Sequence, residues 1–286
     1  MSGVSSINND YKSYQQIISL YESCKDLLFD VIPVSINGFF AANMSSPLGA
    51  VLDKLAWDGI NQINLTVDDD RTKTILRKNN FLSYYGIENV IDSNLTTIPY
   101  MKLKKTDGTF FADYVANKLL ENTGLPKMSD QLKRKIHEGI YEIFVNAQIH
   151  SNTDNIYTCG QYFPNKHTID FTIADTGIGI KKKVNDRFGW NLSSVDAIKW
   201  AMIDRNTTKT GITGGIGLAI LKEFIMKNKG MMQIVSDDGF YQFGHGGETT
   251  ALLTRRFPGT VVNLEFKTDD SCSYSLKSEI DKKNIF

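Results

Sequence analysis

The chain is predicted to be an α/β protein in two parts, because two different patterns follow one another along it. In the first half, short β-branched runs alternate with segments whose apolar residues recur every three or four positions. In the second half, a long helical stripe leads into strand-like runs and two glycine clusters. Alternating strands and helices predict an α/β layer with some parallel pairing. The change of pattern predicts a boundary near residue 124.

The first half divides into an extension and a layer domain. Residues 1–12 are rich in Ser and Asn and are expected to be loose, and residues 13–30 show helical spacing, so 1–30 is predicted to be an N-terminal extension. The layer domain is expected over residues 31–123. Its predicted strands are 32–36, 63–67 and 97–101, and its predicted helices are 48–58, 72–84 and 110–122.

The second half is predicted to be one domain over residues 124–266. Ser129 can cap a long helix that carries one apolar stripe. Strands are expected at 156–159, 169–174, 232–235, 241–243 and 260–266, and helices near 194–203 and 217–229. The stretch after the glycine loop 175–179 is expected to be largely irregular. Residues 267–286 are polar and are expected to form a mobile tail.

Composition excludes several classes of protein. The 32 Lys and Arg balance the 32 Asp and Glu, so no global field draws the chain to nucleic acid or to an anionic membrane. The three cysteines are too widely spaced for a disulfide framework or a zinc site. No run of 18 apolar residues predicts a membrane span. We therefore expect a cytoplasmic protein with reduced thiols.

The first candidate site segment lies inside the long predicted helix. Glu142 and Asn146 are four residues apart, so both project from one helix face. A carboxylate there can act as a general base on water, and an amide oxygen one turn further on can bind Mg²⁺. Taken alone, the segment is more typical of an ordinary solvated helix face.

The second segment is Asp175-Thr176-Gly177-Ile178-Gly179, directly after a predicted strand. An aspartate at a strand end can accept a hydrogen bond from an amine, and the glycines let the backbone approach a planar base. Aspartic proteases also carry Asp-Thr-Gly, but Ser or Thr normally follows it. Ile178 stands here instead, so that interpretation is set aside.

The third segment is the glycine cluster Gly214-Gly215-Ile216-Gly217-Leu218 before a predicted helix. Backbone N–H groups at the start of a helix favour phosphate. The Lys-Ser/Thr of a P-loop is missing, and the surroundings of a dinucleotide fingerprint are wrong.

Together, in this order and spacing, the three segments resemble the N, G1 and G2 boxes of the GHKL ATPase superfamily, over about residues 125–266. The resemblance implies a Bergerat-type α/β sandwich that binds ATP with Mg²⁺. It implies that Asn146 binds Mg²⁺, that Glu142 acts as the general base and that Asp175 reads the adenine amine. Gly177 and Gly179 would shape the base pocket, with Thr260 supporting the base. Phosphate contacts are expected from Gly215 and Gly217, and Leu218 belongs to the same cofactor site.

Residues 180–213 would form the lid over the nucleotide, with a surplus of four positive charges. Lys209, beside the glycine cluster, is the expected phosphate ligand, whereas Lys181–Lys183 are expected in a solvated loop. His137 lies on the Asn146 helix and not on a separate dimerisation hairpin, so histidine autokinase activity is not expected.

The first half has a second resemblance, to STAS domains, carried by Asn43-Met44-Ser45-Ser46-Pro47-Leu48-Gly49. In that family a serine at this helix start accepts phosphate, which would be Ser46 or Ser45 here. Met44 and Pro47 depart from the family pattern, and a simple helix cap explains the serines equally well.

These resemblances predict an ATP-gated partner switch, acting by slow ATP hydrolysis or as a serine/threonine kinase. The expected partner is a regulatory protein of the STAS or sigma/anti-sigma type, and a homodimer stays open. A nucleic-acid-linked ATPase and a non-catalytic ATP-binding module are the alternatives. Neutral charge argues against the first, and the intact Glu142, Asn146 and Asp175 argue against the second.

Overall fold

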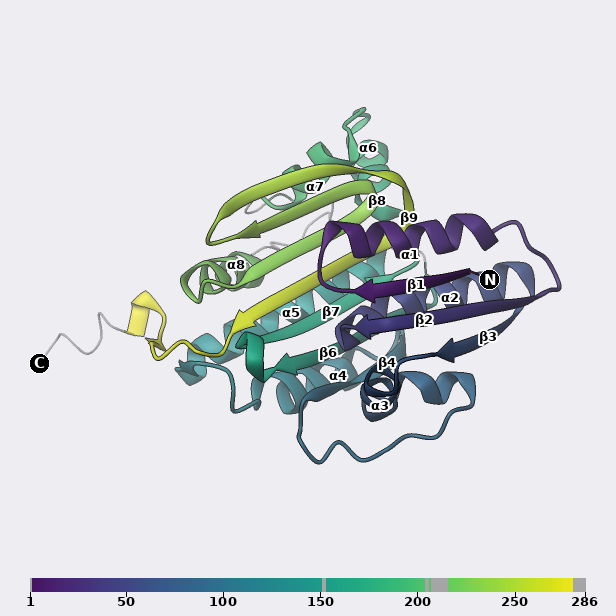
Figure 1. The fold of residues 1–286 in the computed structure, drawn as a ribbon. Coiled ribbons are helices and arrows are strands. Elements are labelled where there is room, and N and C mark those ends of the chain that lie inside the picture. The colour runs from purple at the N-terminus through teal and green to yellow at the C-terminus, as the bar shows by residue number, and fades with distance from the viewer. Residues whose placement is uncertain (1, 151–152, 204–205, 207–215, 280–286) are drawn as a thin grey trace, which may run out of the picture.

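The computed structural model describes residues 2–150, 153–203, 206 and 216–279. Within them the chain is a mixed α/β protein, as predicted, with a three-stranded parallel sheet and a five-stranded antiparallel sheet. Figure 1 shows the parallel strands on one side of the molecule and the antiparallel strands beside them. No helix in this described part is long and apolar enough to cross a membrane.

The parallel sheet has the order β1-β2-β3, and its strands are β1 (Ser2–Ile7), β2 (Val31–Phe40) and β3 (Gln62–Val67). The helices α1 (Tyr11–Cys24) and α2 (Ser45–Gly59) connect them. The expectation of a loose N-terminus is wrong for residues 2–7. They pair with β2 and bury Val4 and Ile7. A Ser-rich segment has little strand propensity of its own, and the neighbouring strand β2 stabilises it as a strand by backbone hydrogen bonds.

The antiparallel sheet has the order β4-β6-β7-β9-β8. Its strands are β4 (Thr97–Lys104), β6 (Asn155–Phe163), β7 (Thr168–Asp175), β8 (Met231–Gly244) and β9 (Gly247–Lys267). Strand β4 was expected in the first layer but pairs with β6 here. Likewise, β8 and β9 are two long strands of one hairpin, where shorter separate strands were expected.

Helices cover the two faces of this antiparallel sheet differently. On one face lie α5 (Asp130–His150), α8 (Ile216–Lys227) and α4 (Gly108–Tyr114), the last continued by the π-helical turn η3 (Val115–Leu120). They share a core with the sheet through residues such as Phe144, Phe171 and Leu221. On the other face lies the N-terminal layer, with α2 packed on β6 and β7. The layers therefore run sheet, helix, sheet, helix.

Three further segments differ from the prediction. The expected helix 72–84 divides into α3 (Asp70–Lys78) and the 3-10 turn η2 (Phe81–Tyr85), because Asn80 between them has a left-handed backbone. The stretch expected to be irregular contains α6 (Gly179–Phe188) besides α7 (Ser194–Ala201). Part of the expected tail is docked, since β10 (Ser273–Tyr274) pairs with β5 (Lys127–Met128).

The seam between the two layers is partly polar. The turn η1 (Ala42–Met44) before α2 places the Nδ2 of Asn43 3.0 Å from Thr172 Oγ1 and 3.1 Å from Asn263 Oδ1, both on the antiparallel sheet. One apolar core nevertheless runs across the seam, from Ile36 and Leu48 to Val261. The two layers therefore pack as one body.

Candidate functional site

Asp175 ends β7 as a buried carboxylate, with 5% of the residue exposed. Its Oδ1 accepts a 2.8 Å hydrogen bond from the Gly177 N–H. Burial raises the pKa of Asp175 to about 7, although backbone hydrogen bonds from Gly177 and Thr260 oppose the rise. No cation lies within ion-pair distance of it in the described part of the chain. The site therefore offers a buried acceptor that no residue of the described ranges neutralises by an ion pair.

The turn after Asp175 is held from the neighbouring strands. Gly179 begins α6 with a φ of +75°, a region that a side chain rarely adopts. The next N–H, of Ile180, donates to Ser236 Oγ at 2.9 Å, and that hydroxyl lies 3.0 Å from Thr260 Oγ1. Thr260 is also paired with Asp175 in the β7–β9 register. The structure thus places Asp175, Gly177, Gly179 and Thr260 side by side, and their roles toward a nucleotide stay predictions.

Sequence reasoning missed Ser236 and a second hydroxyl contact. Thr153, in the connection after α5, places its Oγ1 3.1 Å from Thr176 Oγ1. This contact ties Thr153 to the Asp175 turn. Single hydroxyls in strands and loops carry no sequence signal, so only the fold reveals them.

The face of α5 that carries Glu142 and Asn146 is half-buried. One turn before Glu142, Gly139 lies against Gly217 in the first turn of α8, and a Cβ on Gly217 would come within 2.9 Å of the Gly139 nitrogen. The start of α8 therefore lies against the middle of α5. Along the helix axis, Gly139 and Asn146 are separated by roughly 10 Å, so Asn146 lies about two turns beyond the crossing.

The glycine cluster is described only in part. Gly217 and Leu218 lie in α8, where Leu218 packs half-buried against the core shared with the sheet. Lys209 and Gly215 lie outside the described residues. Their predicted phosphate contacts stay predictions.

Three lysines of the expected lid lie in helices beside carboxylates. Lys181 and Lys182, expected in a loop, are in α6 and pair with Asp237 at 3.6 Å and with Asp186 at 2.8 Å. Lys199 of α7 pairs with Glu248 at 3.2 Å. The expectation of a solvated loop is therefore wrong for this segment.

Ser45 and Ser46 are fully buried where α2 meets the sheet. Ser46 Oγ donates to the Thr172 carbonyl at 3.1 Å, and Ser45 Oγ accepts from Asn79 Nδ2 at 3.2 Å. Neither hydroxyl can meet a phosphate donor in this arrangement. His137 contacts the Ala112 carbonyl at 2.8 Å and joins α5 to α4.

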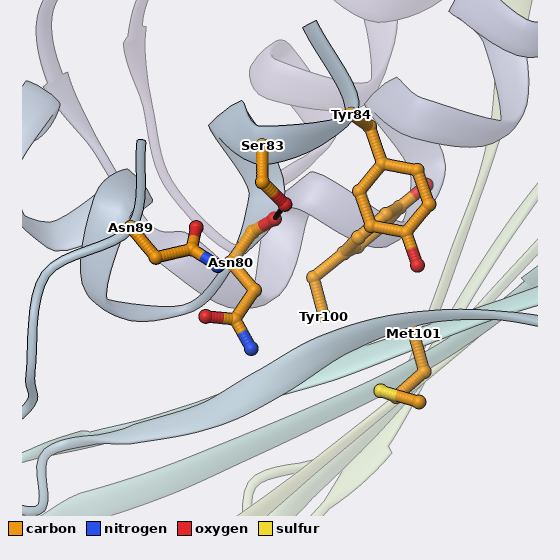
Figure 2. Close-up of a pocket in the computed structure, with 6 residues that line it drawn as sticks. All are labelled: Asn80, Ser83, Tyr84, Asn89, Tyr100 and Met101. Carbon is orange, nitrogen blue, oxygen red and sulfur yellow. Dashed lines mark hydrogen bonds between the residues drawn. The ribbon is translucent and has the colours of Figure 1, made fainter. Parts of the chain in front are cut away.

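A separate surface pocket of about 290 Å³ lies at η2 and β4, not at Asp175. In Figure 2 the tyrosine rings and the Met101 side chain border one side, and two asparagines border the other. The residues that line it are Asn80, Ser83, Tyr84, Asn89, Tyr100 and Met101. None of them belongs to the predicted nucleotide site.

The Asp175 turn offers a buried carboxyl acceptor, and the half-buried Asn146 on α5 offers an amide oxygen. The uncompensated carboxylate is an acceptor for an exocyclic amine. In the described residues no cluster of three or more His, Cys, Asp or Glu side chains could hold a metal alone. Mg²⁺ usually takes one or two protein ligands and completes its shell with phosphate and water oxygens, which a single Asn146 ligand allows. Comparison of the chain with protein-family models and with curated proteins found no match.

Proposed function

We propose that this chain is a Mg²⁺-dependent ATP-binding regulatory protein with a Bergerat-type site, whose nucleotide state controls the binding of a protein partner. The observation that carries the proposal is the buried, uncompensated Asp175 carboxylate at the end of β7. The crossing of α5 and α8 supports it, because it puts a helix N-terminus and the Glu142 face on one side of the sheet. The N-terminal layer would be STAS-like and the protein cytoplasmic.

Each residue then has a distinct role. Asp175 accepts from the adenine amine, and the backbone of Gly177 and Gly179 lets the base approach. Asn146 holds the Mg²⁺ that the nucleotide brings, and the α8 N-terminus faces the phosphates. Glu142 orients and deprotonates the nucleophile, which is a water in a hydrolase and a hydroxyl in a kinase.

Regulation of a partner is supported by the seam between the layers. Ser46, in the first turn of α2, donates to the Thr172 carbonyl, three residues before Asp175 on the same strand. A shift of β7 on nucleotide binding would therefore reach the N-terminal layer through one helix. Such a contact gives two sites a shared structural element, which coupling between them requires.

The proposal is tested by titrating the purified protein with ATP and Mg²⁺ in a calorimeter. Asp175→Asn should weaken ATP binding about tenfold to hundredfold, because an unpaired buried polar group costs about 1–3 kcal/mol. Glu142→Ala should keep ATP binding but lower turnover by roughly 10²–10⁴-fold.

The matched control is Asp170→Asn, the same substitution at a buried aspartate on the other face of β7. It should leave ATP affinity unchanged. A folded Asp175→Asn protein that binds ATP like the wild type would contradict the base-reading role. Labelled ATP, followed by separation of free phosphate from phosphoprotein, then distinguishes hydrolysis from kinase activity.

A further inference from the structure

Large apolar side chains are exposed together at one end of the parallel sheet. Trp57 is 82% exposed and Phe29 is 78% exposed, and their apolar neighbours are exposed as well. We call this the apolar end surface, and its residues are Leu28, Phe29, Val31, Trp57 and Ile60. In Figure 1 it lies at the right-hand end, where the loop after α1 and the turn after α2 meet. Exposed apolar groups gathered in this way mark interaction sites in soluble proteins.

The surface is held in shape by hydrogen bonds. The Phe29 N–H donates to the Gly59 carbonyl at 2.8 Å. Asn61 clamps the loop to the end of α2, because its Nδ2 donates to the carbonyls of Leu27 and Leu55 and its Oδ1 accepts from the Asp30 N–H, each at 2.9 Å. The exposed side chains therefore project from a fixed framework.

The backbone holds two of these side chains outward. Phe29 and Ile60 have φ values of 54° and 53°. Left-handed backbone is rare for a bulky or β-branched residue, and such strain clusters at functional sites. A glycine or asparagine would satisfy both turns with less strain, yet both positions carry large apolar groups.

The rim of the surface is acidic. Its two lysines are already paired, Lys25 with Glu22 at 3.0 Å and Lys54 with Asp58 at 2.8 Å. Asp26 and Asp30 have no ion-pair partner in the described part of the chain. The rim therefore keeps a net negative charge.

The acidic groups of the two helices converge on one side chain. Burial raises the pKa of Tyr21, and the nearby carboxylates of Asp58, Glu22 and Asp26 raise it further. Carboxylates from α1 and from α2 thus border the apolar end surface together.

We propose that the apolar end surface is a docking site for a basic amphipathic segment of a partner protein. Apolar anchors of that segment would cover Trp57 and Phe29, and its Lys or Arg side chains would meet Asp26 and Asp30. Charge decides between occupants, because a second copy would bring acidic rim against acidic rim, and an anionic membrane would be repelled. The proposal does not depend on the nucleotide site.

The test uses the full chain with Trp190→Phe and Trp200→Phe, which leaves Trp57 as its single tryptophan. The probe is a leucine–lysine amphipathic peptide of about 18 residues, long enough for roughly five helical turns. Its binding should move Trp57 emission to shorter wavelength. A peptide of the same pattern with glutamate in place of lysine should not bind.

Substitutions in the apolar end surface and its rim test whether the peptide binds there. In the same background Phe29→Ala should weaken the peptide about tenfold, as the loss of an aromatic anchor does. The double variant Asp26→Asn/Asp30→Asn should weaken it a few-fold, and as a surface change it does not threaten folding. The matched controls, Ile91→Ala and Asp68→Asn/Asp113→Asn, change exposed residues elsewhere and should leave binding unchanged.

Other outcomes would overturn the proposal. Equal binding of the glutamate peptide would show that the apolar end surface does not select its partner by charge. Binding of the lysine peptide that neither Phe29→Ala nor Asp26→Asn/Asp30→Asn weakens would show that the peptide binds elsewhere. Dimers in sedimentation velocity that Phe29→Ala abolishes would make the surface a self-association interface. Co-sedimentation with phosphatidylserine vesicles that Phe29→Ala abolishes would make it a membrane contact.

Discussion

Two aspartates of β7 show how burial sets the behaviour of a single residue. Burial raises the pKa of Asp170 to about 8 and that of Asp175 to about 7. Asp170 faces the seam between the layers, beside Asn263 at 3.4 Å. Both groups hold a proton more tightly in the folded chain than in the unfolded chain. Their contribution to stability is therefore full below about pH 4 and is lost as pH rises through the folded pKa values.

The same ionisation predicts how ATP binding depends on pH. In the proposed role of Asp175, the ionised carboxylate is the stronger acceptor for the adenine amine, and its pKa is about 7. ATP affinity should therefore fall as pH is lowered from 8 to 6, by up to about tenfold per unit below the pKa. Calorimetric titration with ATP across this range measures the effect.

Asp175→Asn provides the control, because an amide does not titrate in this range. The variant should bind weakly with no step near pH 7. An identical step in the wild type and the variant would assign the pH dependence to another group, such as the ATP phosphates.

At the scale of elements, the crossing of α5 and α8 sets the geometry of the proposed nucleotide site. Gly139 and Gly217 leave no room for a Cβ at the crossing. Helices approach this closely only where both carry the smallest residue. The crossing places the α8 N-terminus on the helix face that holds Glu142.

Gly139→Ala should therefore lower both stability and ATP affinity. Alanine favours a helix by about 1 kcal/mol over glycine, so a net loss would show that steric pressure on α8 dominates. Overpacking of this kind typically costs 1–3 kcal/mol. Urea denaturation and calorimetry measure the two effects.

Gly246→Ala is the matched control, since a Cβ there meets nothing within 4 Å. It should change neither stability nor ATP affinity. If Gly139→Ala were as stable as the wild type and bound ATP equally well, the close crossing would not be what holds the site.

At the scale of the whole molecule, the two layers share one core and a polar seam. Asn43 sits at the centre of this seam, fully buried, and bonds to Thr172 and Asn263 across it. A domain that carried its own complete core would not need these contacts. The shared core therefore predicts that the layers unfold together.

Urea unfolding should give a single transition, with the same midpoint whether it is followed by tryptophan emission or by far-UV circular dichroism. Emission of Trp190 and Trp200, which pack with Phe188 beside the antiparallel sheet, reports that layer in the protein with Trp57→Phe, and far-UV circular dichroism reports all helices and strands. Asn43→Ala should lower the midpoint of both curves equally, because it leaves buried partners unpaired at a cost of about 1–3 kcal/mol.

The exposed Asn94→Ala serves as the control and should leave the midpoint unchanged. Two separated transitions in the wild type would show that the layers are independent, and Asn43→Ala would then shift only one of them.

The local sequence pattern was sufficient to predict the helices and strands that depend on nearby residues. The predicted helix from Ser129 agrees with α5, whose Leu132 N–H donates to Ser129 Oγ at 3.2 Å. The strands that became β3, β6 and β7 were placed within a few residues. The cluster of Asp175, Gly177 and Gly179 was also predictable, because these residues follow one another along the chain.

What the sequence by itself determined is thus the α/β class, the periodic helices and the segments that carry the candidate chemistry. Tertiary structure alone decided that residues 2–7 form β1, that β4 joins the antiparallel sheet and that Ser46 is buried. It also decided that Gly139 meets Gly217. The physical reason is that strand pairing, burial and helix crossing depend on partners far away along the chain, whereas caps and periodicity are set within one or two turns.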